Sequence, residues 1–398
     1  MRILLFDDHL RNRFFPLAFT RPLGLLRTGI LTQQESWANL LGNMPSFITA
    51  PELTGSHPPV IGEENLLINA RWLSFSAYRQ DVEALQIGEA LVQDGTVLAA
   101  KCSAHDAQQW QNTLSPPNTL KHVVYNPEGD GQPAVLLTQL TDVFHTLKST
   151  IETDFRQVTY GRITENPDPT VTILGDPDKV FIEPGARVEA CYLNTRSGPI
   201  YIGSDTQIME GAVIHGPVAL AEHVVVRAGA RIYGATSIGP HCKVAGEISN
   251  SLIQGYSNKA HDGFLGNSIL GEWCNLGADT NTSNLKNNYS EVKIWDYAQG
   301  DFAATGLTFC GLIMGDHSKC SINTMFNTGT TVGVSANIFG GGFPPKYIPS
   351  FAWGGAEGFE TYALNKAIET AERVLARRNM QLTDEQRRLF ALLHENAK

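Results

Sequence analysis

The sequence has 398 residues, and since one domain usually takes roughly 150 residues, we expect two or three domains rather than one small module. Hydrophobic residues make up 42% of the chain, which excludes a disordered protein, while only 18% are charged, below the roughly 25% typical of globular proteins. The net charge of −10 argues against nucleic acid or an anionic membrane surface as the partner of the whole molecule.

The first thirty residues depart from this acidic average. They hold five arginines against two aspartates, a local charge of +3, and such a basic concentration indicates a local anion site. Arginines scattered over a surface would give the same count, so that alternative stays open. The apolar run at the start of the chain is too short for the core of a signal peptide, and no apolar run approaches the length of a membrane span. The six cysteines are widely spaced and do not have the spacing of a zinc site. We therefore expect a cytoplasmic location.

The elements expected first along the chain mix strands with a helix. The sequence predicts strands at 2–6 and 66–69, a hairpin at 90–100 turning at Asp94-Gly95, a proline-containing loop at 126–129, and a helix at 134–155. Short strands combined with helices are typical of an α/β domain. We place this domain at 1–165, because the stretch TENPDP that follows it is rich in turn-forming residues.

A six-residue repeat dominates the middle of the chain. Large aliphatic residues occupy eight consecutive sixth positions: Ile202, Ile208, Ile214, Leu220, Val226, Ile232, Ile238 and Val244. The position four residues further on is mostly small or β-branched. A period of six fits neither a helix nor a flat strand unless the chain turns a corner every six residues. Three such faces close a triangular coil of eighteen residues, which predicts a parallel β-helix.

The β-helix is expected from about Ile173 to about Gly341, within a domain at 170–345, with interruptions near 249–267 and 281–307. A helical tail is expected at 355–398, with one helix at 362–378 and a second one beginning at the capping box formed by residues 383–386. Because an open β-helix end leaves backbone groups unpaired, we expect this tail to cap the solenoid or to lie at a subunit contact.

The hexads resemble those of the hexapeptide acyltransferases, whose β-helix is left-handed, although general handedness rules favour the opposite hand. The segment HDGFLGNSILGEWCNLGADTNTSN, His261 to Asn284, is similar to the acetyltransferase centre of the bifunctional glucosamine-1-phosphate acetyltransferase/N-acetylglucosamine-1-phosphate uridyltransferase family. VVVRAGARI, residues 224–232, resembles the arginine-containing coil of the same family. The resemblance implies acetyl-CoA as the acyl donor and a homotrimer with coenzyme A between adjacent subunits.

The resemblance also implies roles for single residues. His261 matches the general base, Asn275 and Asn284 the supporting amides, Arg227 and Glu247 substrate-binding positions, and Gly277 and Ala278 the backbone near coenzyme A. An imidazole suits the role of general base, and backbone N–H groups can stabilise the thioester oxygen. The family's phosphate-binding lysine and sugar-contacting tyrosine fall at Ser249 and Phe264. Alternatively, His261 is a surface histidine and the two asparagines are corner residues of the solenoid.

The N-terminal stretch FFPLAFTRPLGLLRTG, residues 14–29, resembles the opening of sugar nucleotidyltransferases. Nucleotidyl transfer needs Mg²⁺ and cationic side chains as pyrophosphate leaves. The candidate cations are Arg11, Arg13, Arg21 and Arg27, and the candidate metal ligands are Asp7 and Asp8. The family's glycine loop, motif lysine and metal-binding aspartate are replaced here, at residues 7–11, Leu23 and 69–71 respectively.

We thus expect an enzyme of nucleotide-sugar biosynthesis that binds a sugar phosphate and a nucleotide, with N-acetyl transfer to an amino sugar phosphate by the β-helix and nucleotidyl transfer by the N-terminal domain. One alternative is nucleotidyl transfer alone, from UTP or dTTP and a sugar 1-phosphate, with the β-helix as a trimer scaffold. The other is a sugar-nucleotide-binding scaffold without catalysis.

Overall fold

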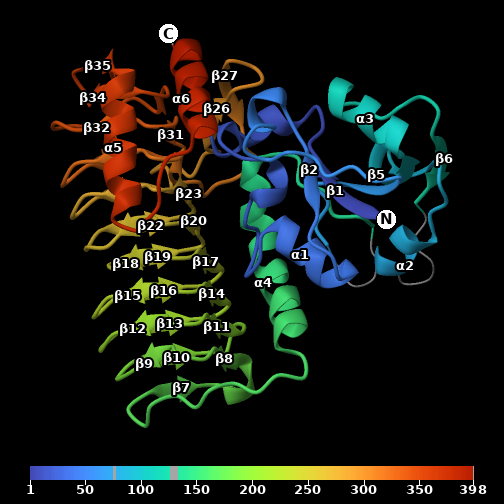
Figure 1. Cartoon of the computed structure of the whole chain (residues 1–398). Helices are drawn as coiled ribbons and strands as arrows, with labels where there is room; N and C mark the ends of the chain where they lie inside the picture. Colours follow the sequence, from blue (N-terminus) through green and yellow to red (C-terminus); the bar gives the residue numbers. More distant parts are fainter. Residues whose placement is uncertain (75–77, 126–132, 398) are drawn as a thin grey trace. The chain divides into compact units, whose positions relative to one another are not determined.

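The structure is a computed structural model that describes residues 1–74, 78–125 and 133–397, and it divides into two compact units (Figure 1). The N-terminal unit comprises Met1–Phe14, Thr20–Leu26 and Leu31–Asp142, and the remainder forms the β-helix unit. The loop expected at 126–129 lies outside the described residues. Within them, none of the helices is both long and apolar enough for a membrane span.

The N-terminal unit is built on one mixed sheet with the strand order β2-β1-β3-β5-β4-β6. Its strands are β1 (Arg2–Phe6), β2 (Ser46–Ile48), β3 (Glu64–Asn69), β4 (Glu89–Gln93), β5 (Thr96–Ser103) and β6 (Lys121–Val124). The predicted strands and hairpin are confirmed, and both turn residues, Asp94 (φ 48°) and Gly95 (φ 76°), have the positive φ that a type I′ turn requires. Because β1, β2 and β3 are parallel, their carboxyl ends share one edge of the sheet.

The described residues of this unit form three α-helices: α1 (Gln33–Leu41), α2 (Arg79–Ala84) and α3 (Ala104–Thr113). α1 begins at a capping box in which Thr32 and Glu35 satisfy each other's backbone N–H groups. α3 packs Trp110 against Phe6 of β1, with ring centroids 4.6 Å apart. Both aromatic side chains are buried, so this contact joins the helix to the centre of the sheet.

The helix predicted at 134–155 begins later than expected. α4 spans Val143–Thr159 and belongs to the β-helix unit, where it contacts strand β17 (Thr236–Ile238). Residues 134–137 are extended instead, because Leu137 N donates to the carbonyl of Arg71 and Leu73 N donates to that of Val135. The two compact units therefore divide at Asp142 and Val143.

The β-helix unit is a parallel β-helix with three faces, as the hexads predict, and it is left-handed, as the resemblance implies (Figure 1). The first face contains β7 (Thr172–Leu174), β10 (Tyr192–Asn194), β13 (Val213–His215), β16 (Arg231–Tyr233), β19 (Glu247–Ser249) and β22 (Phe264–Gly266). The second contains β8 (Val180–Ile182), β11 (Ile200–Ile202), β14 (Val218–Leu220), β17, β20 (Leu252–Gly255), β23 (Ile269–Glu272), β28 (Ile313–Met314), β31 (Thr331–Val332) and β33 (Tyr347–Ile348). The third contains β9 (Arg187–Val188), β12 (Gln207–Ile208), β15 (Val225–Val226), β18 (Lys243–Val244), β21 (Asn258–Lys259), β24 (Asn275–Leu276), β29 (Lys319–Cys320), β32 (Asn337–Ile338), β34 (Ala352–Gly355) and β35 (Gly358–Thr361).

The interior of the β-helix is filled by the aliphatic residue of each hexad. All eight predicted positions from Ile202 to Val244 are at most 1% exposed. Consecutive coils superimpose these residues in register, as in the pairing of Ile208 with Val226 and of Val226 with Val244. Stacking one aliphatic column on each face gives the fold a continuous core.

The two expected interruptions have different structures. Near 249–267 the coils continue, but the step from Val244 to its partner Lys259 is fifteen positions, three fewer than the step from Val226 to Val244. After β25 (Asn281–Thr282), which pairs in parallel with β30 (Met325–Phe326), the chain leaves the coil, forms a hairpin of β26 (Lys293–Asp296) and β27 (Asp301–Ala304), and returns to the second face at β28.

The helical tail follows the last coil, as predicted. It consists of α5 (Leu364–Ala376) and α6 (Asp384–Asn396), which contact each other, and α6 begins at the predicted capping box of Thr383 and Gln386. Arg378, just after α5, donates a hydrogen bond of 3.0 Å to the carbonyl of His241. Phe390 of α6 packs edge-on against His317. The tail therefore contacts the corner of the β-helix on which both histidines lie.

Candidate functional site

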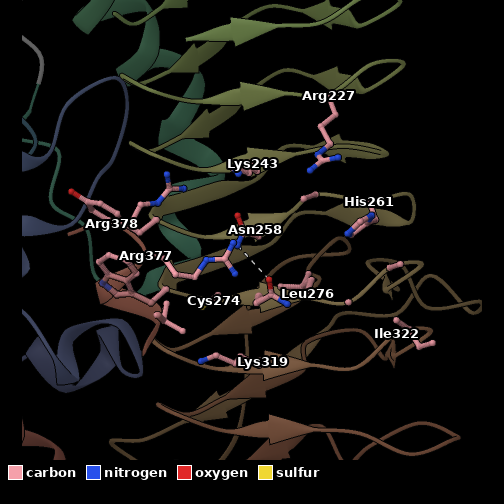
Figure 2. A pocket seen from close by; sticks show the side chains of 17 residues that line it. Arg227, Lys243, Asn258, His261, Cys274, Leu276, Lys319, Ile322, Arg377 and Arg378 are labelled. Carbon is pink, nitrogen blue, oxygen red and sulfur yellow. Dashed lines mark hydrogen bonds between the residues drawn. The ribbon is translucent and has the colours of Figure 1, made fainter. Parts of the chain in front are cut away.

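A cavity of about 700 Å³ lies on the third face of the β-helix (Figure 2). It is lined by Arg227, Lys243, Tyr256, Asn258, Ala260, His261, Trp273, Cys274, Asn275, Leu276, Gly277, Ala278, Lys319, Ile322, Val374, Arg377 and Arg378. Val374 belongs to α5 and Arg377 and Arg378 follow that helix, while the other lining residues come from consecutive coils and their corners. The cavity thus belongs entirely to the β-helix unit.

One wall of the cavity is a column of polar side chains that point outward from the third face. Strand pairing places Lys243, Asn258, Asn275 and Lys319 opposite one another on four successive coils. The Asn258 Nδ2 to Asn275 Oδ1 distance is 3.4 Å. These residues alternate with the inward residues of the same strands, because side chains of a strand point to its two faces in turn.

A second wall is a stack of rings at one corner of the β-helix. His223, His241, Tyr256, Trp273 and His317 follow one another on successive coils, with ring centroids between 4.3 and 6.2 Å apart. All five residues have a positive φ, between 52° and 61°. Because this backbone conformation directs each side chain alike, the rings superimpose, and Tyr256 and Trp273 present theirs to the cavity.

The cavity is strongly basic. Five of its side chains are arginines or lysines, and none of the described residues that line it is an aspartate or glutamate. Lys319 Nζ donates to the carbonyl of His317 at 2.7 Å, and burial lowers the pKa of Lys319 to about 8. A bound anion would raise this pKa again, since opposite charge favours the protonated amine. The arrangement suits a ligand that carries more than one phosphate.

The cavity brings together five residues that the sequence singled out: Arg227, His261, Asn275, Gly277 and Ala278. His261 is exposed on the corner between β21 and β22. Figure 2 shows His261 and Arg227 at one side of the cavity and Arg377 and Arg378 at the opposite side.

The other two predicted residues of the β-helix do not line it. Asn284 Nδ2 donates to Asn267 Oδ1 at 2.8 Å, and Glu247 lies 3.5 Å from Arg231 in an exposed ion pair.

Four basic lining residues escaped the sequence analysis: Lys243, Lys319, Arg377 and Arg378. Lys243 and Lys319 each precede an inward hexad residue, so the repeat itself carried the signal that they point outward beside Asn258 and Asn275. Arg377 and Arg378 lie about a hundred positions along the chain from Ala278, the nearest lining residue that the sequence singled out. Nothing in their local sequence indicates a contact with the cavity.

The predicted metal ligands of the N-terminal unit are engaged by other side chains. Asp7 Oδ1 accepts from Leu23 N at 2.9 Å, and its Oδ2 accepts from the Thr49 hydroxyl at 2.6 Å. Asp8 accepts from Arg71 Nε at 2.9 and 3.0 Å and from Arg71 Nη2 at 2.5 Å. Arg71 is only 2% exposed, so this ion pair is largely removed from water.

The two carboxyl groups have opposite pKa shifts. Burial raises the pKa of Asp7 to about 6, and the charge of Arg11 opposes this only in part. Burial would also raise the pKa of Asp8, but the hydrogen bonds and charge of Arg71 outweigh it and hold the pKa below its ordinary value. Within the described ranges, no three histidine, cysteine or acidic side chains lie close enough together to hold a metal. This donor set does not fit Mg²⁺, and we base no step on one.

The predicted arginines of the first thirty residues do not form one cluster. Arg11 pairs with Asp7 and with Glu52, at 3.4 and 3.1 Å, while Arg13 is exposed. Arg21 is buried in the N-terminal unit. Arg27 belongs to the β-helix unit, where its backbone N–H donates to Gln254 and its guanidinium to the carbonyl of Ile30.

The sequence that forms the sheet of the N-terminal unit matches one known family. Residues 3–163 match the family model of sugar nucleotidyl transferases. The predicted resemblance of the N-terminal part is thereby confirmed. In this matched segment, the carboxyl-terminal edge of β1, β2 and β3 carries Asp7, Asp8 and Thr49, which is where open α/β sheets bind ligands.

Two curated relatives are bifunctional. The chain is 30% identical over 95 residues to a bifunctional sugar-1-phosphate nucleotidylyltransferase/acetyltransferase of Sulfurisphaera tokodaii, covering 24% of this chain and 23% of the relative. It is 34% identical over 87 residues to the bifunctional protein GlmU of Methanocaldococcus jannaschii, covering 22% and 21%. The chain thus spans less than a quarter of the length of the curated relatives it matches.

Two solved structures share part of the chain at low similarity. The UDP-N-acetylglucosamine acyltransferase of Francisella novicida is 13% identical, with a TM-score of 0.30, over 56% of this chain and 74% of that one. The polySia-specific acetyltransferase NeuO is 13% identical, with a TM-score of 0.27, over 55% and 97%.

Asp7 makes a pH-dependent contribution to the stability of the N-terminal unit. A folded pKa of about 6 against an ordinary 3.8 means that the contribution of Asp7 to the free energy of unfolding is fully present below about pH 4 and is lost as the pH rises through 6. We expect Asp7→Asn to be more stable than the wild type by about 1–3 kcal/mol at pH 7.5, and the difference to shrink towards pH 4. Urea unfolding at several pH values measures this, with the exposed Glu63→Gln as control. A pH-independent difference would contradict it.

Proposed function

We propose that the β-helix transfers an acetyl group from acetyl-CoA to the amine of an amino sugar phosphate, within the biosynthesis of nucleotide sugars. The observation that carries this proposal is the cavity, in which an exposed histidine faces basic side chains without a carboxylate among the described residues of its wall. Both substrates carry phosphate, and the bifunctional names of the curated relatives are consistent with acetyl transfer.

In the proposed reaction the amine nitrogen attacks the carbonyl carbon of the thioester. The N–C bond forms, the C–S bond breaks, and the sulfur leaves with the electron pair of that bond as the thiolate of coenzyme A. His261 accepts the proton that the nitrogen loses and returns it to the thiolate. We assign the stabilisation of the thioester oxygen to the backbone N–H of Ala278, which lines the same cavity, because the N–H of Gly277 already donates to the carbonyl of Cys320 at 3.1 Å.

The two sides of the cavity suit the two phosphorylated substrates. Arg227 is the cation at the side of His261, so we assign the sugar phosphate to it. Lys243, Lys319, Arg377 and Arg378 serve the phosphates of coenzyme A, while the rings of Tyr256 and Trp273 suit stacking with a nucleobase.

The test is release of coenzyme A from acetyl-CoA over a panel of amino sugar phosphates. Formation of one N-acetylated product, identified by mass spectrometry, supports the proposal. If the folded protein releases no coenzyme A with any amine of the panel beyond the rate without protein, the proposal is wrong.

Arg377 is expected to contribute to donor binding. One hydrogen-bonded ion pair with a phosphate contributes about 1.5–3 kcal/mol, so we expect Arg377→Ala to raise the KM for acetyl-CoA about 10-fold or more, with little effect on kcat. The matched control is Arg373→Ala on the same helix, because Arg373 is 78% exposed and pairs with Glu369 instead of lining the cavity. An equal effect of both substitutions would contradict this role.

A second candidate function is nucleotidyl transfer by the N-terminal unit, which the family match favours. It predicts pyrophosphate release from UTP or dTTP with Mg²⁺ and a sugar 1-phosphate. The ion pair of Asp8 with Arg71 favours the remaining alternative, binding of a sugar nucleotide without turnover. Titration calorimetry beside the pyrophosphate assay distinguishes the two, since only the first consumes the nucleotide.

We also propose a homotrimer in the cytoplasm. All six cysteines are unpaired and buried, which suits a reducing compartment. Sedimentation equilibrium determines the assembly state, and a monomer at micromolar concentration would exclude the trimer.

A further inference from the structure

One interior position of the β-helix holds a lysine in place of an aliphatic residue. Lys259 of β21 pairs in register with Val244 of β18, and its side chain is 1% exposed. A buried charge costs folding free energy, and an aliphatic residue of similar volume at such a position is often neutral or stabilising. The packing of the core therefore gives no reason for a lysine here.

The ammonium group of Lys259 is instead used as a hydrogen-bond donor to one stretch of backbone. Lys259 Nζ donates to the carbonyl of His261 at 2.5 Å, to that of Asp262 at 3.0 Å and to that of Ala245 at 3.3 Å. These three bonds use all three of its donors. Burial lowers the pKa of Lys259 to about 8, and the charges of Asp262 and Asp279 oppose that shift.

The corner that Lys259 holds lies against a preceding corner that is shorter than those of regular coils. β15 and β16 are joined by residues 227–230, whereas β18 and β19 are joined by Ala245 and Gly246 alone. The following corner, 260–263, lies against this short one: a Cβ at Gly246 would meet the carbonyl oxygen of His261 at 3.0 Å. Gly263 closes the corner with a φ of 112°. The carbonyls of His261 and Asp262 thus turn towards the interior.

The side chain of His261 points away from that interior. It is exposed, and it lies in the cavity beside Arg227 (Figure 2). Because the carbonyl and the side chain of one residue are joined through a single Cα, fixing the carbonyl of His261 restricts where its imidazole can lie. The same holds for the path of the chain through Asp262.

We propose that Lys259 is a positioning residue, whose ammonium holds the backbone of His261 and Asp262 so that the imidazole of His261 stays in the cavity. The catalytic part of this inference rests on the function proposed above. Lys259 itself touches no substrate, since its amine lies inside the coil.

The test is Lys259→Met, which replaces the ammonium by an apolar group of similar length. We expect the melting temperature to stay within a few degrees of the wild type or to rise, while kcat for acetyl transfer falls about 10-fold or more and the KM for acetyl-CoA changes less than twofold. Lys259→Gln, which keeps two amide donors, should recover part of kcat. The control is Ile338→Met, in the same interior face on another coil and away from the cavity.

A readout without turnover separates this inference from the proposed function. Diethyl pyrocarbonate modifies exposed imidazoles, and mass spectrometry follows it at His261 and at His215, which lies outside the cavity. We expect Lys259→Met to change the rate at His261 at least threefold and leave that at His215 unchanged. The inference is overturned if diethyl pyrocarbonate modifies His261 at the same rate in Lys259→Met and in the wild type. It is also overturned if Lys259→Met has a much lower melting temperature than the wild type but an unchanged kcat. If Lys259→Met does not fold, the same comparison with Lys259→Gln decides. An inactive wild type refutes only the proposed function.

Discussion

Replacing His261 by alanine is expected to lower kcat for acetyl transfer by about 10²- to 10⁴-fold, the usual contribution of a positioned general base. The KM for acetyl-CoA should change little, because Arg377 and Arg378, two of the basic residues assigned to the donor, lie on the side of the cavity opposite His261 (Figure 2). Coenzyme A release from acetyl-CoA, followed at saturating amine, measures the effect. The remaining activity should increase as the pH rises, since a larger fraction of the amine is then unprotonated without help.

Two controls accompany this variant. His215→Ala removes a histidine that packs against Tyr233 at a tilt outside the cavity, and it should retain wild-type kcat. The melting temperature of His261→Ala should equal that of the wild type, because the side chain is exposed. Wild-type turnover by His261→Ala would exclude the histidine as the base and return it to the alternative of a surface residue.

Arg71→Ala is expected to destabilise the N-terminal unit by about 3–5 kcal/mol, because it leaves the Asp8 carboxylate without its partner in a mostly buried place. The carbonyl of Leu137 also loses the donor Arg71 Nη1, at 2.6 Å. Urea unfolding at pH 7.5 gives the difference. The native pKa of Asp8 lies below its ordinary 3.8, so the stability that this pair contributes is present above about pH 4 and is lost as the pH falls through the native pKa. The deficit of the variant should therefore shrink in acid.

Two further variants make this prediction specific. Arg79→Ala breaks an ion pair with Glu83 whose side chains are 55% and 48% exposed, and it should cost no more than about 0.5 kcal/mol. The double variant Asp8→Asn, Arg71→Met removes both charges and should recover much of the loss. If Arg71→Ala costs no more than Arg79→Ala, the ion pair does not stabilise the unit.

The repeat made most of the fold predictable. Each hexad position is selected mainly by packing against the same position of the neighbouring coils, so a plain periodicity identified both the β-helix and its interior residues. The start of α4 was not predictable in this way, because residues 134–137 have helical spacing but form hydrogen bonds with Arg71 and Leu73, which are distant in sequence.

The candidate site was predictable only in part. The resemblance singled out His261, Asn275 and Arg227, and all three line one cavity. It gave no information on Arg377 and Arg378, whose contact with the cavity depends on how α5 packs. The ion pair of Asp8 was also not predictable from the sequence, since its partner Arg71 follows another strand that is distant along the chain.

The fifteen-position step between Val244 and Lys259 has a consequence for how such sequences are aligned. If the eighteen-residue repeat is continued into this coil from the coils before or after it, these residues are assigned to the wrong faces of the β-helix. Profile methods that score periodicity will therefore give this coil a low score. The coil with the low score carries His261 and the lysine beneath it. In solenoid enzymes, a local loss of phase thus points to the residues that packing alone did not select, and a search for such losses can locate sites where no motif is known.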